Sequence, residues 1–374
     1  MTRINFAMGP YRGGGPRNVY ILSKLLSDIG YISEVLQFVD ASYFDFLSEN
    51  TMKVPSFGAN LSSPGILKSF SNITFELIYK IPATLLLPIV TFSLITRTLT
   101  LSKYNKADLY IATDWGSFIP TFLVSRRRGS PMLYFVQADE STFNKDPSFK
   151  MMAISTYRAP IARITQSKLV KKILDEKYGG ITHYIGFGIN PSFFSPPIQD
   201  KENLIFTIAR KSYDKGFDIF VNAINYLWNK RKDFSVMIAG DPGAISTQKV
   251  LFPFSYLGWI TDDIEMTSIY NKSIFVHTGR FEALPMPVLE AMASGSSVVI
   301  SNISGNAEFS EPYKNCLVSE VDSYISVANN IEILIDNAEL RRAISNGGRL
   351  TAKNYRWELV IQRLKSILDK EFGI

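Results

Sequence analysis

Strand-length apolar runs alternate with stretches of helical periodicity along the first half of the chain. Residues 4–8 form a short apolar run typical of a buried strand, and a glycine- and proline-rich turn follows over residues 9–17. Apolar side chains then recur on one broad helical face until Gly30, which ends the predicted helix. The same pattern predicts strands at residues 33–38, 108–112 and 132–136, and a helix at 118–124.

The alternation restarts beyond a proline-rich stretch at residues 185–197. Strand and helix in alternation imply a parallel sheet with helices on both faces. We therefore predict an α/β protein with domains at residues 1–185 and 186–356, followed by a C-terminal segment at 357–374. In this second half the pattern predicts strands at residues 204–208, 234–239, 256–258, 273–276 and 297–300, and helices at 217–228, 284–294 and 357–372.

Length and composition agree with two folded domains. The chain has 374 residues, of which 46% are hydrophobic and 20% charged, as in globular rather than disordered proteins. Its net charge of +6 suits a nucleic acid, an anionic membrane surface, a phosphorylated small molecule, or simply a solvated surface. Because the sequence has neither a dense basic stripe nor a known nucleic-acid module, we expect no nucleic-acid partner.

Cysteine and histidine usage bounds the compartment and the metal chemistry. The single cysteine, Cys316, rules out a disulfide within one chain and fits a reducing cytoplasm. Together with two distant histidines, His183 and His277, it does not make a Cys/His zinc site. The first residues lead straight into a predicted strand, so we expect no secretory signal.

One apolar segment, residues 81–95, bears on the question of membranes. It carries no charge but is shorter than the ~20 residues of a spanning helix, and it holds two prolines. A buried helix of an α/β domain and a helix lying on a membrane surface both fit it better than a span does. The flanking basic residues Lys80, Arg97 and Lys103 agree with either of these two interpretations.

A basic turn follows the strand predicted at residues 204–208. Arg210, Lys211 and Lys215 lie in this turn, before the next helix and at the carboxyl edge of the predicted sheet. An arginine fork, lysine charges and a helix N-terminus together suit a phosphate or diphosphate. A solvated basic turn would contain the same residue types, so the pattern alone leaves both interpretations open.

Two glutamates, Glu282 and Glu290, flank the start of a later predicted helix. A carboxylate accepts hydrogen bonds from pairs of sugar or ribose hydroxyls. The backbone amides of Ala283 and Leu284 can face a diphosphate at the start of the helix. Two surface glutamates of an amphipathic helix are the alternative.

Polar residues and glycines also follow strands of the first domain. Gly13, Gly14 and Gly15 come after the first strand, where glycine lets a backbone approach a ligand closely. Their spacing is not that of the G-x-G-x-x-G fingerprint, which argues against a nicotinamide dehydrogenase. Asp114 ends another strand and can either face an acceptor or cap the following helix.

In this order, these features resemble glycosyltransferase family 4, whose members have the GT-B fold of two facing Rossmann-like domains with parallel sheets and a central cleft. The likeness runs nearly end to end, and it implies that the helix from Trp357 crosses back onto the first domain. It rests on the glycine loop, Arg210 with Lys215-Gly216, the two glutamates with Glu-Ala-Met-Ala-Ser-Gly at 290–295, residues 304–308 and 315–318, and Trp357-Glu358.

The resemblance implies a donor site for a nucleotide-diphosphate sugar. Arg210 and Lys215 would hold the diphosphate and stabilise its charge as it leaves, and Glu282 would lie near the transferred sugar. We predict these three as catalytic residues. Glu290 would bind the ribose. The other donor contacts would come from the backbone amides of Ala283, Leu284, Gly14 and Gly15, and from Trp259 and Ile260 beside the base.

Members of the family are retaining and need no metal ion. The chain lacks the Asp-x-Asp motif that holds a cation in the other glycosyltransferase fold, and we predict neither a metal site nor a cofactor. Many members have a histidine where this chain has Gln137, and Gln137 with Asp139 is more similar to the subset that builds rhamnan-type polysaccharides. We predict Asp114, Gln137 and Asp139 as acceptor-side residues.

We thus predict a retaining, metal-independent hexosyltransferase that moves a sugar from a nucleotide-diphosphate sugar to a lipid-linked glycan or polysaccharide. A nucleotide-sugar epimerase of the same fold and a non-catalytic glycan-binding module are the alternatives. The basic charge and residues 81–95 favour a cytoplasmic protein that works at the inner face of the cell membrane, with an anionic membrane surface as a further partner.

Overall fold

A computed structural model describes most of the chain as two units. The described residues are 1–9, 14–37, 51–53, 94–95, 97–99, 101–104, 106–142, 147–195 and 202–374. The N-terminal unit comprises Met1–Ile185 and Ile361–Ile374, and the C-terminal unit comprises Gly186–Val360. Gly13, most of the apolar segment at 81–95 and the end of the proline-rich stretch at 185–197 lie outside the described residues.

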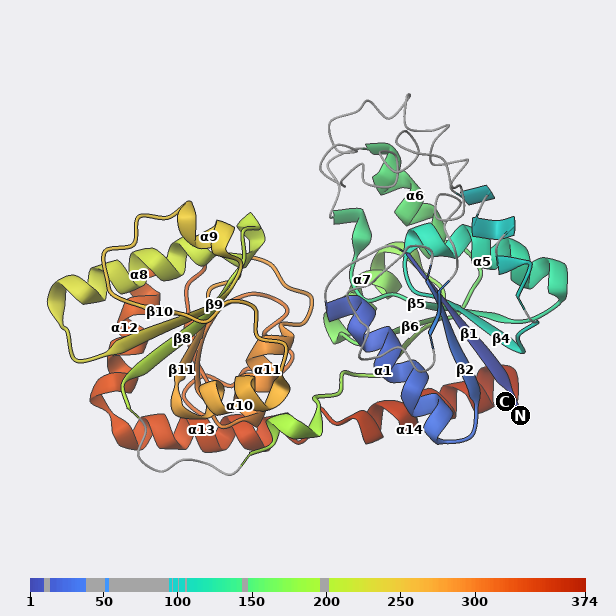
Figure 1. Ribbon diagram of the computed structural model, residues 1–374. Coiled ribbons are helices and arrows are strands. Elements are labelled where there is room, and N and C mark those ends of the chain that lie inside the picture. Colours follow the sequence, from blue (N-terminus) through green and yellow to red (C-terminus); the bar gives the residue numbers. More distant parts are fainter. Residues whose placement is uncertain are drawn as a thin grey trace, which may run out of the picture. The chain divides into compact units, whose positions relative to one another are not determined.

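The N-terminal unit is built on a sheet whose strands all run parallel (Figure 1). Its order is β3-β2-β1-β4-β5-β6-β7, and β4 and β5 are buried along their whole length, as expected where helices cover both faces. The strands are β1 (Arg3–Met8), β2 (Ile32–Gln37), β3 (Thr51–Lys53), β4 (Leu109–Ala112), β5 (Met132–Phe135), β6 (Arg163–Thr165) and β7 (Thr182–Tyr184). The helices are α1 (Gly14–Asp28), α5 (Trp115–Arg128), α6 (Pro147–Tyr157), α7 (Lys168–Tyr178) and the short η2 (Glu140–Thr142).

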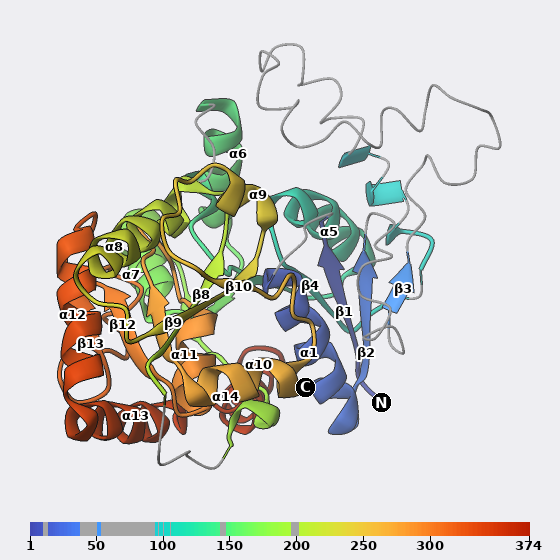
Figure 2. The ribbon, with the colours of Figure 1, turned by 60° about the vertical axis from the view of Figure 1, so that its left-hand side comes forward.

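The C-terminal unit has a second parallel sheet, in the order β10-β9-β8-β11-β12-β13. One apolar core packs α8 and α12 against this sheet and another packs α10 and α11, so helices cover both of its faces (Figure 2). The strands are β8 (Leu204–Ala209), β9 (Ser235–Gly240), β10 (Ser255–Tyr256), β11 (Ile274–His277), β12 (Ser297–Ser301) and β13 (Leu317–Ser319). The helices are η3 (Pro191–Phe193), η4 (Tyr213–Lys215), α8 (Phe217–Lys230), α9 (Pro242–Ser246), α10 (Asp263–Lys272), α11 (Met286–Ala293), α12 (Tyr324–Asp336) and α13 (Ala338–Ala352).

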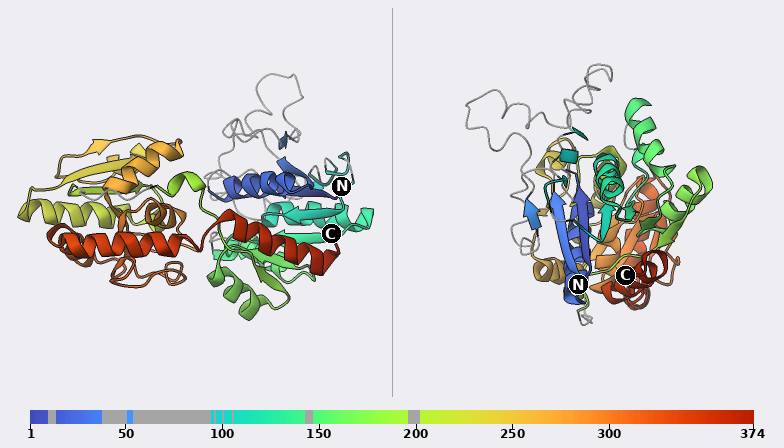
Figure 3. Two further views of the ribbon diagram at one scale, coloured as in Figure 1. Left: turned by 90° about the horizontal axis from the view of Figure 1, so that it is seen from below. Right: turned by 90° about the vertical axis from the view of Figure 1, so that its right-hand side faces the viewer.

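The last helix, α14 (Trp357–Phe372), begins in the C-terminal unit and ends in the N-terminal unit. At its start Trp357 lies so close to Gly188 that a Cβ there would be 2.2 Å from the indole. Further along, Arg363 Nη1 donates to the Ile185 carbonyl at 3.2 Å, and most of the helix lies along the N-terminal unit (Figure 3). The division into units therefore falls inside α14, after Val360, whereas the sequence placed a boundary at residues 356–357.

The predicted α/β class with two Rossmann-like parallel sheets is confirmed. The strand predicted at residues 256–258 is shorter, because Gly258 turns the chain with a φ of 69°. Among the helices that the structure describes, none combines the length and the apolar character needed to cross a bilayer.

Candidate functional site

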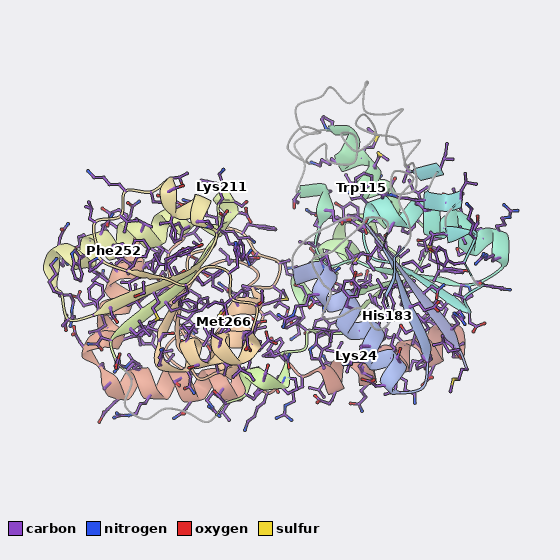
Figure 4. All side chains as sticks on the ribbon, in the orientation of Figure 1. Lys24, Trp115, His183, Lys211, Phe252 and Met266 are labelled. Atoms are coloured by element: carbon purple, nitrogen blue, oxygen red, sulfur yellow. The ribbon has the colours of Figure 1, made fainter. Side chains whose placement is uncertain are left out.

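The sheet order of the C-terminal unit places a ligand site between β8 and β11. These two strands are neighbours, yet the chain continues from β8 to β9 on one side and from β11 to β12 on the other. Ligands of open α/β sheets bind at such a switch point, outside the carboxyl ends of the strands. The basic turn after β8 and the turn that carries Glu282 after β11 both lie there, and Figure 4 labels Lys211 in the first of them.

Lys215 and Glu282 meet at this switch point although 67 positions separate them. Lys215 Nζ lies 2.7 Å from Glu282 Oε1 and 3.1 Å from Asp214 Oδ2, and His277 Nε2 lies 3.6 Å from the same Glu282 oxygen. Burial raises the pKa of Glu282, but the hydrogen bond from His277 and the charge of Lys215 outweigh it, so the net pKa is lowered. Burial lowers the pKa of Lys215, but Glu282 and Asp214 outweigh this effect, so the net pKa of Lys215 is raised. The pair is therefore ionised, and a third of the Lys215 side chain, 32%, faces solvent.

Backbone contacts hold the two turns against each other. Gly216 has a φ of 63°, and a Cβ at this position would lie 1.9 Å from the Thr278 carbonyl oxygen. Thr278 Oγ1 donates to the Gly216 carbonyl at 2.7 Å, and the Arg280 amide donates to the Asp214 carbonyl at 2.7 Å. Lys215 thus sits on a turn whose approach to β11 requires glycine.

Arg280 makes ion pairs that stabilise the same turns, a role that the sequence did not suggest. Its guanidinium is bidentate to Asp218, at 2.8 and 2.7 Å, and reaches Asp322 at 2.5 Å. It also lies 4.0 Å from the centre of the Tyr213 ring. Since these contacts occupy the fork of Arg280, we regard it as a positioning residue.

Arg210 lies beside Trp259, another predicted donor residue. Its guanidinium carbon is 4.6 Å from the centre of the indole ring, and Trp259 is 51% exposed. Ile260, next along the chain, packs on the core of the unit. A half-exposed aromatic face and a cation are thus available side by side near the end of β8.

The segment from Glu282 to Glu290 leads into α11. Ala283 and Leu284 precede the helix, and a Cβ at Gly305 would lie 2.1 Å from the Glu282 carbonyl oxygen, so the turn after β12 packs directly on this backbone. Glu290 lies in the second turn of α11 and is partly exposed.

Glu290 and Arg210 share a buried neighbour, Tyr270 of α10. Burial raises the pKa of Tyr270, the charge of Glu290 adds to the rise, and Arg210 opposes it. Among the described residues, the Tyr270 hydroxyl is buried without a hydrogen-bond partner. Sequence reasoning misses this tyrosine, because it lies at an apolar helix position that is typical of a core.

In the N-terminal unit, the switch point lies between β1 and β4. Gly14 and Gly15 begin α1 after β1, and a Cβ at Gly15 would lie 3.2 Å from Gln137 Oε1. Gln137 is therefore a neighbour of the predicted glycine turn.

Asp114, at the end of β4, is buried as the N-cap of α5. Its Oδ1 accepts from the Ser117 amide at 2.9 Å, and its Oδ2 accepts from the Gly9 amide at 2.8 Å. The sequence left two roles open for Asp114, and the structure shows one of them, the helix cap. A contact of Asp114 with an acceptor stays a prediction.

Asp139 and Glu140 follow β5 on the same edge of the N-terminal sheet. Asp139 Oδ1 accepts from the Ser141 hydroxyl at 2.6 Å. Glu140 Oε2 accepts from the Trp115 amide at 3.0 Å and from the Tyr134 hydroxyl at 3.3 Å; Trp115 is labelled in Figure 4. Burial, and then the charge of Asp114, raise the pKa of Glu140 to about 8. Nothing in the sequence assigns a role to Glu140, because its burial and its partners come from elements distant in the chain.

For metal ions, the described residues contain no group of three or more His, Cys, Asp or Glu side chains that could hold one. Metal independence itself stays a prediction. The roles of the donor and acceptor residues likewise stay predictions.

Comparison with known sequences finds a family match for the C-terminal unit. Residues 189–351 match the family described as Glycosyl transferases group 1. An uncharacterized glycosyltransferase of Haemophilus influenzae is 27% identical over 214 residues, which are 55% of this chain and 60% of that protein. The N,N'-diacetylbacillosaminyl-diphospho-undecaprenol alpha-1,3-N-acetylgalactosaminyltransferase of Campylobacter jejuni is 27% identical over 175 residues, 46% of either chain. The matched region thus spans about half the length of these curated relatives.

Comparison with solved structures extends over both units. Sucrose-phosphate synthase from Thermosynechococcus elongatus superposes with a TM-score of 0.78 at 15% identity, covering 100% of both chains. HepE from Anabaena, solved in complex with UDP and glucose, has a TM-score of 0.75 at 16% identity and covers 99% of this chain and 100% of that one. At such identities the likeness establishes the fold, which is the predicted GT-B fold.

Proposed function

We propose that this protein is a glycosyltransferase that uses a nucleotide-diphosphate sugar as donor and a lipid-linked glycan as acceptor, because residues 189–351 match the family described as Glycosyl transferases group 1. The observation that carries the proposal is the ionised pair of Lys215 and Glu282 at the switch point between β8 and β11. A cation and a carboxylate at this edge suit, respectively, a diphosphate and the hydroxyls of a sugar.

The donor is assigned by the chemistry of the groups around the pair. Lys215 and Arg210 supply positive charge for a diphosphate, and the half-exposed Trp259 supplies an aromatic face for a base. Glu290 supplies a partly exposed carboxylate for the ribose hydroxyls. HepE, which has the same fold, was solved with UDP and glucose bound, and this supports a nucleotide sugar as the ligand.

In the reaction we propose, the bond between the anomeric carbon and the diphosphate oxygen breaks, and its electron pair leaves with the nucleoside diphosphate. Lys215 and Arg210 stabilise the charge that develops on the leaving group, because both cations are held in place before the bond breaks. Glu282 keeps Lys215 ionised and aimed, and it accepts hydrogen bonds from the transferred sugar. The acceptor hydroxyl oxygen forms the new bond to the anomeric carbon, and its proton passes to the departing diphosphate oxygen, with retention of configuration and without a metal ion.

The acceptor is assigned by analogy with the relatives. The Campylobacter jejuni relative is named for a diphospho-undecaprenol acceptor, and a Salmonella typhimurium relative is named lipopolysaccharide 1,2-N-acetylglucosaminetransferase. A lipid-linked acceptor would bring the protein to a membrane surface from the cytoplasm, where a net charge of +6 favours anionic lipids.

A transfer assay tests this proposal. The full chain is incubated with UDP-, GDP-, ADP- and dTDP-sugars and undecaprenyl-diphosphate-linked sugars, and the products are analysed by mass spectrometry, with NMR for the anomeric configuration. We expect transfer from one donor class, and at least a hundredfold loss of kcat/KM in Lys215→Ala and Arg210→Ala. Lys249→Ala, which removes an exposed lysine from the same unit, serves as the control.

Three results would contradict the proposal. Full activity of Lys215→Ala at limiting donor would remove the assignment of the pair. Conversion of the donor sugar without an acceptor would indicate an epimerase instead. Donor binding that survives without any turnover would indicate a non-catalytic module.

A further inference from the structure

Glu140 occupies an unusual position at the carboxyl edge of the N-terminal sheet. It follows β5 and lies next to the switch point between β1 and β4, where its Oε2 accepts from the first amide of α5, that of Trp115, at 3.0 Å. The Tyr134 hydroxyl lies 3.3 Å from the same oxygen, and the Glu140 amide donates to the Tyr157 hydroxyl at 2.8 Å. The carboxyl is thus held by groups from α5 and β5, and the backbone of Glu140 by Tyr157 of α6.

The surroundings of Glu140 keep its proton exchangeable near neutral pH. Burial raises its pKa to about 8, and the nearby charge of Asp114 adds to the rise. The amide of Trp115 and the hydroxyls of Tyr134 and Tyr157 act in the opposite direction, because they donate hydrogen bonds to the carboxylate. A carboxyl of this kind changes its charge within the range where enzymes work.

Two neighbouring oxygens of the same loop lack hydrogen-bond donors. Gln137 Oε1 and Asp139 Oδ2 are buried, and among the described residues neither has a partner. Asp139 is 3% exposed. Buried hydrogen-bond acceptors without a donor are rare, and they indicate a ligand or water that donates hydrogen bonds to them. Since these are acceptor atoms, the matching ligand is one rich in hydroxyl groups.

We propose that Glu140, with Gln137 and Asp139 beside it, binds hydroxyl groups of the acceptor glycan in the N-terminal unit, and that its ionised form is the binding form. This inference rests on the proposed function, because it names the acceptor contact of that reaction. The ionised carboxylate accepts a hydrogen bond from a sugar hydroxyl and makes a charge-assisted contact. The protonated form has lost one of its acceptor sites and the charge.

The charged and titratable groups around Glu140 come from four elements. Asp114 at the start of α5, Tyr134 on β5 and Tyr157 on α6 act on it directly. Asp139 on its own loop and Tyr178 on α7 act on Tyr157. Tyr134 and Tyr157 stay protonated at neutral pH, because burial raises the pKa of each hydroxyl well above its ordinary value.

The test is the pH dependence of acceptor use in the full chain. Initial rates are measured from pH 6 to 9.5 with saturating donor and varied lipid-linked acceptor, for the wild type, Glu140→Gln and the control Glu176→Gln on α7. The wild type and the control should show kcat/KM for the acceptor rising through an inflection near pH 8. Glu140→Gln should lose this inflection, and its KM for the acceptor at pH 9 should be at least about tenfold higher. Its Kd for the donor, measured by calorimetry, should be unchanged.

A second variant, Tyr134→Phe, keeps the test decisive if Glu140→Gln folds poorly. It removes one hydrogen bond that lowers the pKa of Glu140, so the inflection should move to higher pH. An inflection that persists in Glu140→Gln, a KM within twofold of the wild type, or an inflection unmoved in Tyr134→Phe would overturn the inference. If the wild type transfers no sugar from any donor, the proposed function itself fails, which is a different result from these three.

Discussion

The close contact between the turns after β8 and β11 can be broken by one methyl group, in Gly216→Ala. Gly216 has a φ of 63°, which costs an alanine roughly 1 kcal/mol. Its new Cβ would lie 1.9 Å from the Thr278 carbonyl oxygen, so the turns must separate by about 1.5 Å to reach van der Waals contact. That movement breaks the 2.7 Å hydrogen bonds from Thr278 Oγ1 to Gly216 and from the Arg280 amide to Asp214, each worth about 1 kcal/mol.

The expected loss is therefore about 3 kcal/mol, or roughly 6–12 °C in Tm for a unit of this size. Gly258→Ala is the matched control, because Gly258 has a φ of 69° in the same unit but nothing within 4 Å of its Cβ position. It should lose only the conformational part, about 1 kcal/mol. Thermal unfolding of the full chain, followed by circular dichroism, measures both. Equal losses in the two variants would refute the close-approach argument.

Four further outcomes follow from the structure. A pKa raised to about 8 means that the native state binds the Glu140 proton more tightly than the unfolded state does, and this stability is lost as the pH rises through the raised pKa. The Tm of Glu140→Gln relative to that of the wild type should therefore rise from pH 5 to pH 9. A constant difference in Tm would contradict this. The lowered pKa of Glu282 has the opposite sign, so its pairing adds stability that is lost on acidification, and Lys215→Met should lessen that loss in acid-unfolding curves. Asp114→Ala should lose about 2 kcal/mol with its helix cap and the bond from the Gly9 amide, whereas Asp114→Asn, which has a single acceptor oxygen, should keep the cap and lose about half as much in denaturant titrations. Transfer should be unchanged by a chelator, and activity restored only by added metal would count against metal independence.

The sequence predicted the strands whose apolar runs are long enough to show their pattern, including β1, β8 and β9. It missed β6, β7 and β13, because three residues are too few to display a period of two. Sheet order is the information that the pattern lacked. Only that order shows that the turns after β8 and β11 share one edge of the sheet.

For the candidate site, the sequence likewise predicted the residue types but not their contacts. The residue types of Lys215 and Glu282 indicated a diphosphate and a sugar, but their 2.7 Å contact depends on the switch point. Glu140 can be located after β5 from the sequence, but its raised pKa comes from burial and from Asp114, 26 positions earlier. Tyr270 could not be told from a core residue, since its neighbours Glu290 and Arg210 come from other elements.

The central claim is that the switch point between β8 and β11 holds a nucleotide-diphosphate sugar through Lys215. Calorimetric titration of UDP-, GDP-, ADP- and dTDP-sugars into the wild type, Lys215→Ala and the surface control Lys249→Ala tests it most directly. We predict that the wild type and the control bind one nucleotide class equally well, and that Lys215→Ala binds it at least tenfold more weakly. Equal affinity of Lys215→Ala and the wild type, or no binding of any of these donors by the wild type, would contradict the claim.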